Sequence, residues 1–81
     1  MDSKLIFDDD TVIGYAGDIT GWLAEQIETL SNKLLVDIDL IDELCEFTNL
    51  CKDVATNYDE RAILKIFPSL MGTYTIKILD E

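Results

Sequence analysis

The sequence predicts an α+β fold in which an antiparallel helical hairpin packs on a small antiparallel β-sheet. Two amphipathic stretches in the middle of the chain predict the helices, and a short connection between them favours an antiparallel pair. A carboxy-terminal stretch of alternating apolar and polar residues predicts strand. The 81 residues allow one small domain, which we expect to span residues 1–81.

The amino-terminal part of the chain contains two short apolar runs. Lys4 to Phe7 and Val12 to Ala16 are separated by the acidic sequence Asp8-Asp9-Asp10-Thr11. Aspartate-rich segments between apolar runs are typical of turns. We therefore expect a hairpin or two short extended pieces with an acidic loop between them.

The first helix is predicted over residues 19–33. Asp18 or Thr20 offers a side-chain oxygen that can cap the start of this helix. Apolar residues follow at intervals of three and four, which places them on one face of a 3.6-residue period. These residues are Ile19, Leu23, Ile27, Leu30 and Leu34.

The second helix is predicted over residues 39–57, with Asp37 and Asp39 as capping candidates. Its apolar residues again share one face. They are Leu40, Leu44, Phe47, Cys51, Val54 and Tyr58.

The carboxy-terminal region is predicted to form strands. Residues 73–79 alternate with a period of two and are rich in β-branched and aromatic residues. Residues 61–67 fit either a strand or a continued helix. We favour a strand, because a nearly continuous apolar run ends there at a proline, and we expect Phe67 in the core. Residues 68–72 would then form the turn between the two strands.

The residue types present argue against catalysis, cofactor binding and metal binding. The chain has no histidine, so it lacks the usual proton shuttle near neutral pH and the commonest metal ligand. The aspartates at positions 8–10 and 37–39 lack the spacing and central glycine of a calcium-binding EF-hand. We expect a protein that is not an enzyme and has no cofactor.

The two cysteines and the hydropathy predict a cytoplasmic protein. Cys45 and Cys51 lie six residues apart on one predicted helix, so their side chains point about 120° apart and cannot easily form a disulfide. Reduced thiols are typical of intracellular proteins. No apolar run approaches the roughly 20 residues of a membrane span, and we expect no membrane association. The sequence leaves the oligomeric state open.

The negative charge is concentrated in one part of the chain. The formal net charge is −11. Residues 1–51 contain twelve acidic and two basic residues, whereas residues 52–81 contain five acidic and four basic residues. Direct binding to nucleic acid is close to excluded, because the phosphates would meet like charge. A basic protein partner is expected instead.

A helical projection of the second helix separates its acidic residues from its apolar face. Leu50 falls among the acidic residues in this projection, so we interpret it as an apolar contact to a partner. The acidic turn near the amino terminus is a further candidate contact. The candidate partner-binding residues are Asp8, Asp9, Asp10, Asp39, Asp42, Glu43, Glu46, Leu50 and Asp53.

In size and charge, the chain resembles the small acidic proteins that phages and mobile elements direct against host defences, such as anti-CRISPR and anti-restriction proteins that mimic DNA. The resemblance is to this class of viral protein and rests on no sequence motif. It implies an inhibitor that works in the host cytoplasm by protein–protein interaction and occupies a basic nucleic-acid-binding surface. The alternative is an immunity protein or antitoxin that neutralises a basic nuclease toxin, because the same charge complementarity would serve it.

Overall fold

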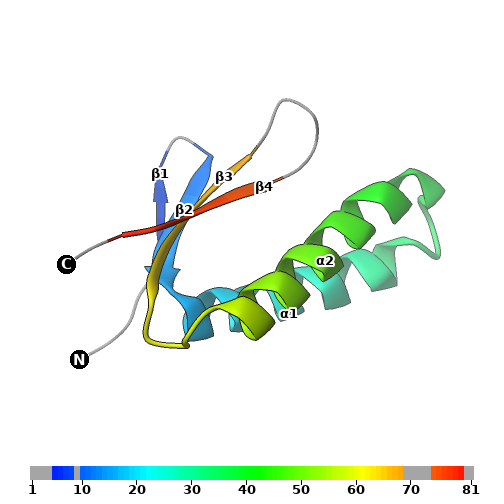
Figure 1. The fold of residues 1–81 in the computed structure, drawn as a ribbon. Helices are drawn as coiled ribbons and strands as arrows, with labels where there is room; N and C mark the ends of the chain where they lie inside the picture. Colours follow the sequence, from blue (N-terminus) through cyan, green and yellow to red (C-terminus); the bar gives the residue numbers. More distant parts are fainter. Residues whose placement is uncertain (1–4, 9, 69–73, 80–81) are drawn as a thin grey trace.

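The computed structural model describes residues 5–8, 10–68 and 74–79. Within these residues, two helices pack against one face of a four-stranded antiparallel sheet of order β1-β2-β3-β4 (Figure 1). The elements in chain order are β1 (Ile6–Asp8), β2 (Thr11–Tyr15), α1 (Ala16–Lys33), the 3-10 turn η1 (Ile38–Leu40), α2 (Ile41–Asn57), β3 (Ile63–Pro68) and β4 (Tyr74–Ile78). The predicted α+β arrangement of a helical hairpin on a small antiparallel sheet is confirmed.

The predicted amino-terminal hairpin is present as β1 and β2. Asp8 pairs with Thr11, and the Thr11 hydroxyl donates a hydrogen bond to the Asp8 carbonyl oxygen. Asp10 has a φ of 68°, in the left-handed region that aspartate tolerates better than most residues. The acidic residues at 8 and 10 therefore help to form the turn. Asp9 lies outside the described residues.

Strands β3 and β4 pair antiparallel, which confirms the choice of strand over helix for residues 61–67. Leu64 and Ile66 point to the helices and are buried, whereas Ile63, Lys65 and Phe67 alternate onto the opposite face and are only half-buried. The expectation that Phe67 lies in the core is therefore wrong. Pro68 closes β3, and the rest of the predicted turn lies outside the described residues.

Helix α1 begins three residues earlier than predicted, at Ala16, and neither predicted capping side chain is used. The backbone N–H groups of Ala16 and Gly17 donate instead to the carbonyl oxygens of Ala62 and Glu60, at 2.8 and 2.9 Å. The first N–H groups of a helix need acceptors from outside the helix, and here a distant loop supplies them. This capping by tertiary contacts leaves no local signal in the sequence.

Helix α2 begins at Ile41, after η1. Helix α2 itself has Leu40 as its N-cap and no side-chain cap, so neither predicted residue caps α2 directly. The Asp37 carboxylate accepts a hydrogen bond from the Asp39 N–H at 3.1 Å and caps η1. The turn that precedes it, residues 34–36, connects α1 to η1. The connection is short, and α1 and α2 lie antiparallel and side by side (Figure 1).

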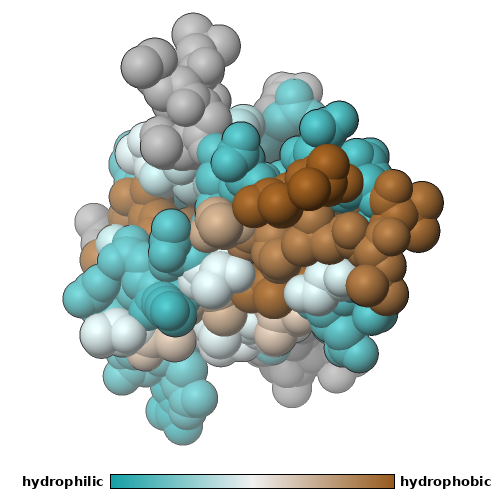
Figure 2. Space-filling model, turned by 90° about the vertical axis from the view of Figure 1, so that its right-hand side faces the viewer, coloured by the Kyte–Doolittle hydropathy of each residue, from teal (hydrophilic) through white to brown (hydrophobic). Residues whose placement is uncertain are grey.

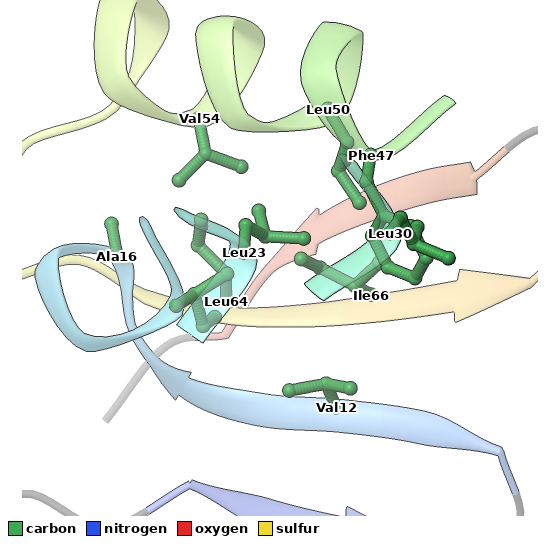
Figure 3. Close-up of a cluster of buried hydrophobic side chains, with 10 residues drawn as sticks. Val12, Ala16, Leu23, Leu30, Phe47, Leu50, Val54, Leu64 and Ile66 are labelled. Carbon is green, nitrogen blue, oxygen red and sulfur yellow. The ribbon is translucent and has the colours of Figure 1, made fainter. Parts of the chain in front are cut away.

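The hydrophobic core lies between the two helices and the inner face of the sheet. Its buried residues come from β2, both helices and β3, and their side chains converge in Figure 3. They are Val12, Ala16, Ile19, Leu23, Leu30, Phe47, Leu50, Val54, Leu64 and Ile66. A row of aromatic rings crosses the same layer, with Trp22 against Phe7 and Phe47, and Phe47 against Tyr74, at centroid distances of 5.6 to 6.0 Å.

Cys45 and Cys51 are both free thiols, as their spacing predicts. The Cys51 thiol lies between the helices and contacts the Thr20 carbonyl oxygen at 3.8 Å. Neither α1 nor α2, the two α-helices of the described residues, has the length and apolar character that crossing a membrane requires.

Candidate protein-binding surface on helix α2

Acidic residues line one flank of α2. Asp42, Glu46, Asn49 and Asp53 follow one another at intervals of four, three and four residues, which places them in one row along the helix. Asp42 and Asp53 are exposed and Glu46 is half-exposed. We call these three acidic residues, together with Glu43 at the start of α2 and Asp39 in η1, the α2 acidic row. Its members are Asp39, Asp42, Glu43, Glu46 and Asp53. From Asp39 to Asp53 the row is about 21 Å long, or one carboxylate per about 5 Å of helix axis.

Two residues of the α2 acidic row lie near Tyr74 of strand β4. Glu46 and Asp53 line an open groove between α2 and β4, together with Asn49, Leu50 and Tyr74. The groove has a volume of about 380 Å³. It therefore combines two carboxylates, an amide and a phenol with one leucine side chain, and its charge suits a cationic group with an apolar stem.

The carboxylates of the row affect the pKa of the tyrosine in this groove. Burial raises the pKa of the Tyr74 phenol above its ordinary value, and the nearby carboxylates of Glu46 and Glu43 raise the pKa further. A negative phenolate would be repelled by both carboxylates, so the neutral phenol is favoured. The negative potential of α2 thus extends across to the edge of the sheet.

The carboxylates of the row form no ion pair with the lysines and arginine that the structure describes. Among residues 5–8, 10–68 and 74–79, no lysine or arginine nitrogen lies within ion-pair distance of them. Asp53 accepts a hydrogen bond from the Asn57 side chain, which is uncharged. The row therefore keeps its charge available for a partner.

Leu50 lies in the core, which corrects its interpretation as an exposed contact. Its side chain is 6% exposed and points from α2 in the same direction as Phe47 and Val54 (Figure 3). The helix is rotated so that the centre of its buried face lies between Phe47, Leu50 and Val54. The helical projection placed this centre nearer to Leu44 and Cys51, which are only half-buried.

The structure does not bring the amino-terminal aspartates together with the α2 acidic row. Asp8 and Asp10 belong to the turn between β1 and β2, and β1 is the edge of the sheet opposite β4. Three strand spacings separate these edges, which is about 14 Å. The predicted set of partner-binding residues is therefore divided between two places.

The tip of the helical hairpin carries exposed apolar residues that the sequence analysis did not identify. Leu35 and Val36 are 90% and 92% exposed, and Ile38 and Ile41 are 72% and 45% exposed. Figure 2 views the molecule from the hairpin end and shows hydrophobic residues gathered in one area with hydrophilic residues around it. We call these four residues the tip patch. Three successive apolar residues at positions 34–36 interrupt the spacing of three and four residues in the first helix. This interruption is the feature of the sequence that could have identified the tip patch.

The open face of the sheet has the opposite charge. Lys65 and Lys77 pair directly across β3 and β4, and neither α1 nor α2 covers this face. The Lys65 ammonium lies 5.1 Å from the centre of the Phe67 ring, within the range of a cation–π contact. The outer side of the sheet thus has two lysines next to each other, on the side of the sheet away from the helices.

Within the described part of the chain, no three cysteine, aspartate or glutamate side chains are grouped to hold a metal ion. Cys45 is exposed on α2.

Comparison of the chain with protein-family models, with curated proteins and with solved structures finds no match to any of the three.

Proposed function

We propose that this protein is an inhibitor that binds, through the α2 acidic row, to the basic nucleic-acid-binding surface of a host defence protein of the CRISPR or restriction type. The observation that carries the proposal is the row itself, which follows η1 and α2, is exposed except for the half-exposed Glu46, and has no ion pair with a cation of the described residues. Neighbouring carboxylates in such a row repel each other by a few tenths of a kcal/mol per pair. A binding role accounts for this cost.

The charge spacing of the row supports mimicry of a nucleic-acid strand. With one carboxylate per about 5 Å of axis, the row has about two-thirds of the linear charge density of a single DNA strand, which has one phosphate per roughly 3.4 Å. A groove of lysines and arginines that binds phosphates would therefore meet a similar field. Such long-range attraction accelerates association, and it weakens as salt concentration rises.

Phage plating on bacteria with a CRISPR–Cas or restriction system tests the proposal. Expression of the protein is expected to raise the plating efficiency of a targeted phage at least tenfold in one such strain. The double variant Asp42→Lys with Glu46→Lys should abolish this effect, because like charges would then face each other. Glu25→Lys with Glu28→Lys on α1 makes the same change in net charge at exposed positions away from the row and should retain the effect.

Circular dichroism of both variants serves as the folding control. Full inhibitory activity in the Asp42 and Glu46 variant, with an unchanged spectrum, would remove the α2 acidic row from the mechanism. Loss of activity in both variants would assign the effect to net charge alone and contradict the proposed location.

The tip patch favours a second candidate function, that of an immunity protein for a basic nuclease toxin. Mimicry of a phosphate backbone needs no apolar contact, whereas a dedicated protein partner gains affinity from aliphatic side chains that enter its surface. Aspartates at 37, 39 and 42 lie among the four apolar residues, so such a partner would be basic around an apolar pocket. Rescue of growth during expression of a nuclease toxin, and loss of rescue in Leu35→Asp, would favour this candidate.

A further inference from the structure

Among residues 5–8, 10–68 and 74–79, strand β4 has one edge without a partner strand. It is the last strand in the sheet order, and within these residues it pairs with β3 alone. The Leu79 N–H donates to the Ile63 carbonyl oxygen at 2.8 Å, which identifies this pair as hydrogen-bonded. Hydrogen-bonded and non-hydrogen-bonded pairs alternate along an antiparallel ladder. Lys77 and Thr75 therefore bond to β3.

It follows that the backbone N–H and C=O groups of Tyr74, Ile76 and Ile78 point away from β3, to the open edge. Pro68, which has no N–H, pairs with Tyr74, a position where the ladder requires no donor from β3. The edge thus presents three donors and three acceptors in the regular spacing of a strand. Unpaired edges of this kind are templates for the addition of another strand.

The surroundings of this edge differ in charge between the two faces of the sheet. On the inner face, Glu46 and Asp53 stand over the groove beside Tyr74. On the outer face, Lys77 is exposed, with Lys65 directly opposite on β3. An added strand would therefore place cationic side chains on the inner face and uncharged side chains on the outer face.

We propose that the edge of β4 binds an extended basic segment of a protein partner as a fifth strand, with its lysine or arginine side chains in the groove beneath α2. This proposal rests on the proposed function for the sign of the partner's charge. The long apolar stems of these side chains pack on Leu50 and Tyr74, and their charged ends reach Glu46 and Asp53.

A second copy of the chain is a poorer occupant of the same edge. Pairing β4 with β4 of another copy would bring two α2 acidic rows together, each without cationic partners in the described residues. On the outer face, the Lys77 side chains of the two copies would also come near each other. Charge thus disfavours self-association here and favours a cationic strand.

A capped peptide of alternating residues, Lys-Val-Lys-Val-Lys-Val-Lys, is the probe. Titration into the ¹⁵N-labelled protein is expected to shift the amide signals of Tyr74, Ile76 and Ile78 and to slow their hydrogen exchange at least tenfold. The control peptide has the same four lysines and three valines in two blocks, so its charge is equal but its pattern cannot match the two faces. It should bind at least tenfold more weakly.

Two methylated peptides test the backbone bonds directly. One carries N-methyl groups on the lysine backbone nitrogens and the other on the valine backbone nitrogens. If the peptide adds antiparallel to β4, the backbone N–H groups of its inward-facing lysines donate to the edge. If the peptide adds parallel to β4, the backbone N–H groups of its valines do so. Each main-chain bond changes affinity by about fivefold, so one of the two peptides should lose at least tenfold. Equal binding of the parent and both methylated peptides would overturn the proposal.

The charged part of the groove is tested with Glu46→Gln and Asp53→Asn together. This double variant should weaken binding of the alternating peptide at least tenfold, whereas Glu25→Gln with Glu28→Gln should leave it within about twofold. The alternating and block peptides could bind equally well and both be weakened by Glu46→Gln. This result would refute strand addition, but it would leave the binding role of the α2 acidic row in place. Protected edge amides and a dimer in the free protein would assign the edge to a second copy and also refute the proposal.

Discussion

Replacement of Leu50 by alanine measures directly how α2 is oriented. Leu50 is 6% exposed and belongs to the core cluster with Phe47 and Val54. Removal of a buried leucine side chain costs about 2–5 kcal/mol, because apolar contacts are lost and a cavity remains. Leu50 also borders the open groove, so water and neighbouring groups can relax into the space. We therefore expect a loss of about 2–3 kcal/mol, in the lower part of that range.

This loss is large for a chain of 81 residues. A total stability of about 4–12 kcal/mol is typical at this length. In a domain of this size, each kcal/mol shifts the melting temperature by about 4–8 °C, so Leu50→Ala should lower it by roughly 10–20 °C. Urea titration followed by circular dichroism gives the free energy of unfolding, and differential scanning calorimetry gives the melting temperature.

Leu35→Ala is the matched control, since it deletes the same atoms at a residue that is 90% exposed. Its effect on the free energy of unfolding should stay within about 0.5 kcal/mol. If Leu50→Ala were as mild as Leu35→Ala, Leu50 would not be a core residue, and the helix orientation described above would be wrong.

Three further predictions concern glycine, helix capping and pH. Gly21→Ala should stabilise the protein by about 0.5–1 kcal/mol in a urea titration, because the new Cβ in mid-helix meets nothing within 4 Å. Gly17→Ala should stabilise it less by the same measure, because its Cβ would contact the Glu60 side chain at 3.2 Å. Asp37→Ala should cost about 1 kcal/mol by loss of a cap, and Asp18→Ala, where no side-chain cap exists, less than half of that by the same measure. The pKa of Tyr74 is raised in the folded protein, so as the pH rises above 10.0 the tyrosine of the unfolded chain ionises first. The free energy of unfolding should therefore decrease above pH 10.0. Tyr74→Phe should make this decrease smaller, as measured by melting curves at different pH values.

The α2 acidic row was found from the sequence because charge and helical period are local properties. Asp42, Glu46 and Asp53 fall on one flank of any helix that contains them, whatever that helix packs against. Their nearness to Tyr74 is different. It depends on the position of β4 beside α2, and residues 58–73 separate these two elements in the chain.

The missed assignments share a physical cause. Leu50 was placed on the wrong side of its helix because a projection gives the relative angles of residues, and only the packing partners select the direction that is buried. The start of α1 was missed because its first N–H groups bond to Glu60 and Ala62, which are more than forty residues away in the chain. The tip patch escaped notice because the exposure of Leu35 depends on the absence of any element above it, and local composition does not report this.

The sequence by itself determined the two helices, the two hairpins and the uneven distribution of charge, since hydrophobic period, turn residues and charge are written in neighbouring positions. The tertiary structure decided which face of each element is buried, which strand edge stays open and which carboxylates meet the same groove. All three depend on distances between residues that are remote in the chain. These distances are fixed only when the two helices pack on one face of the sheet and the close packing of the core allows a single arrangement.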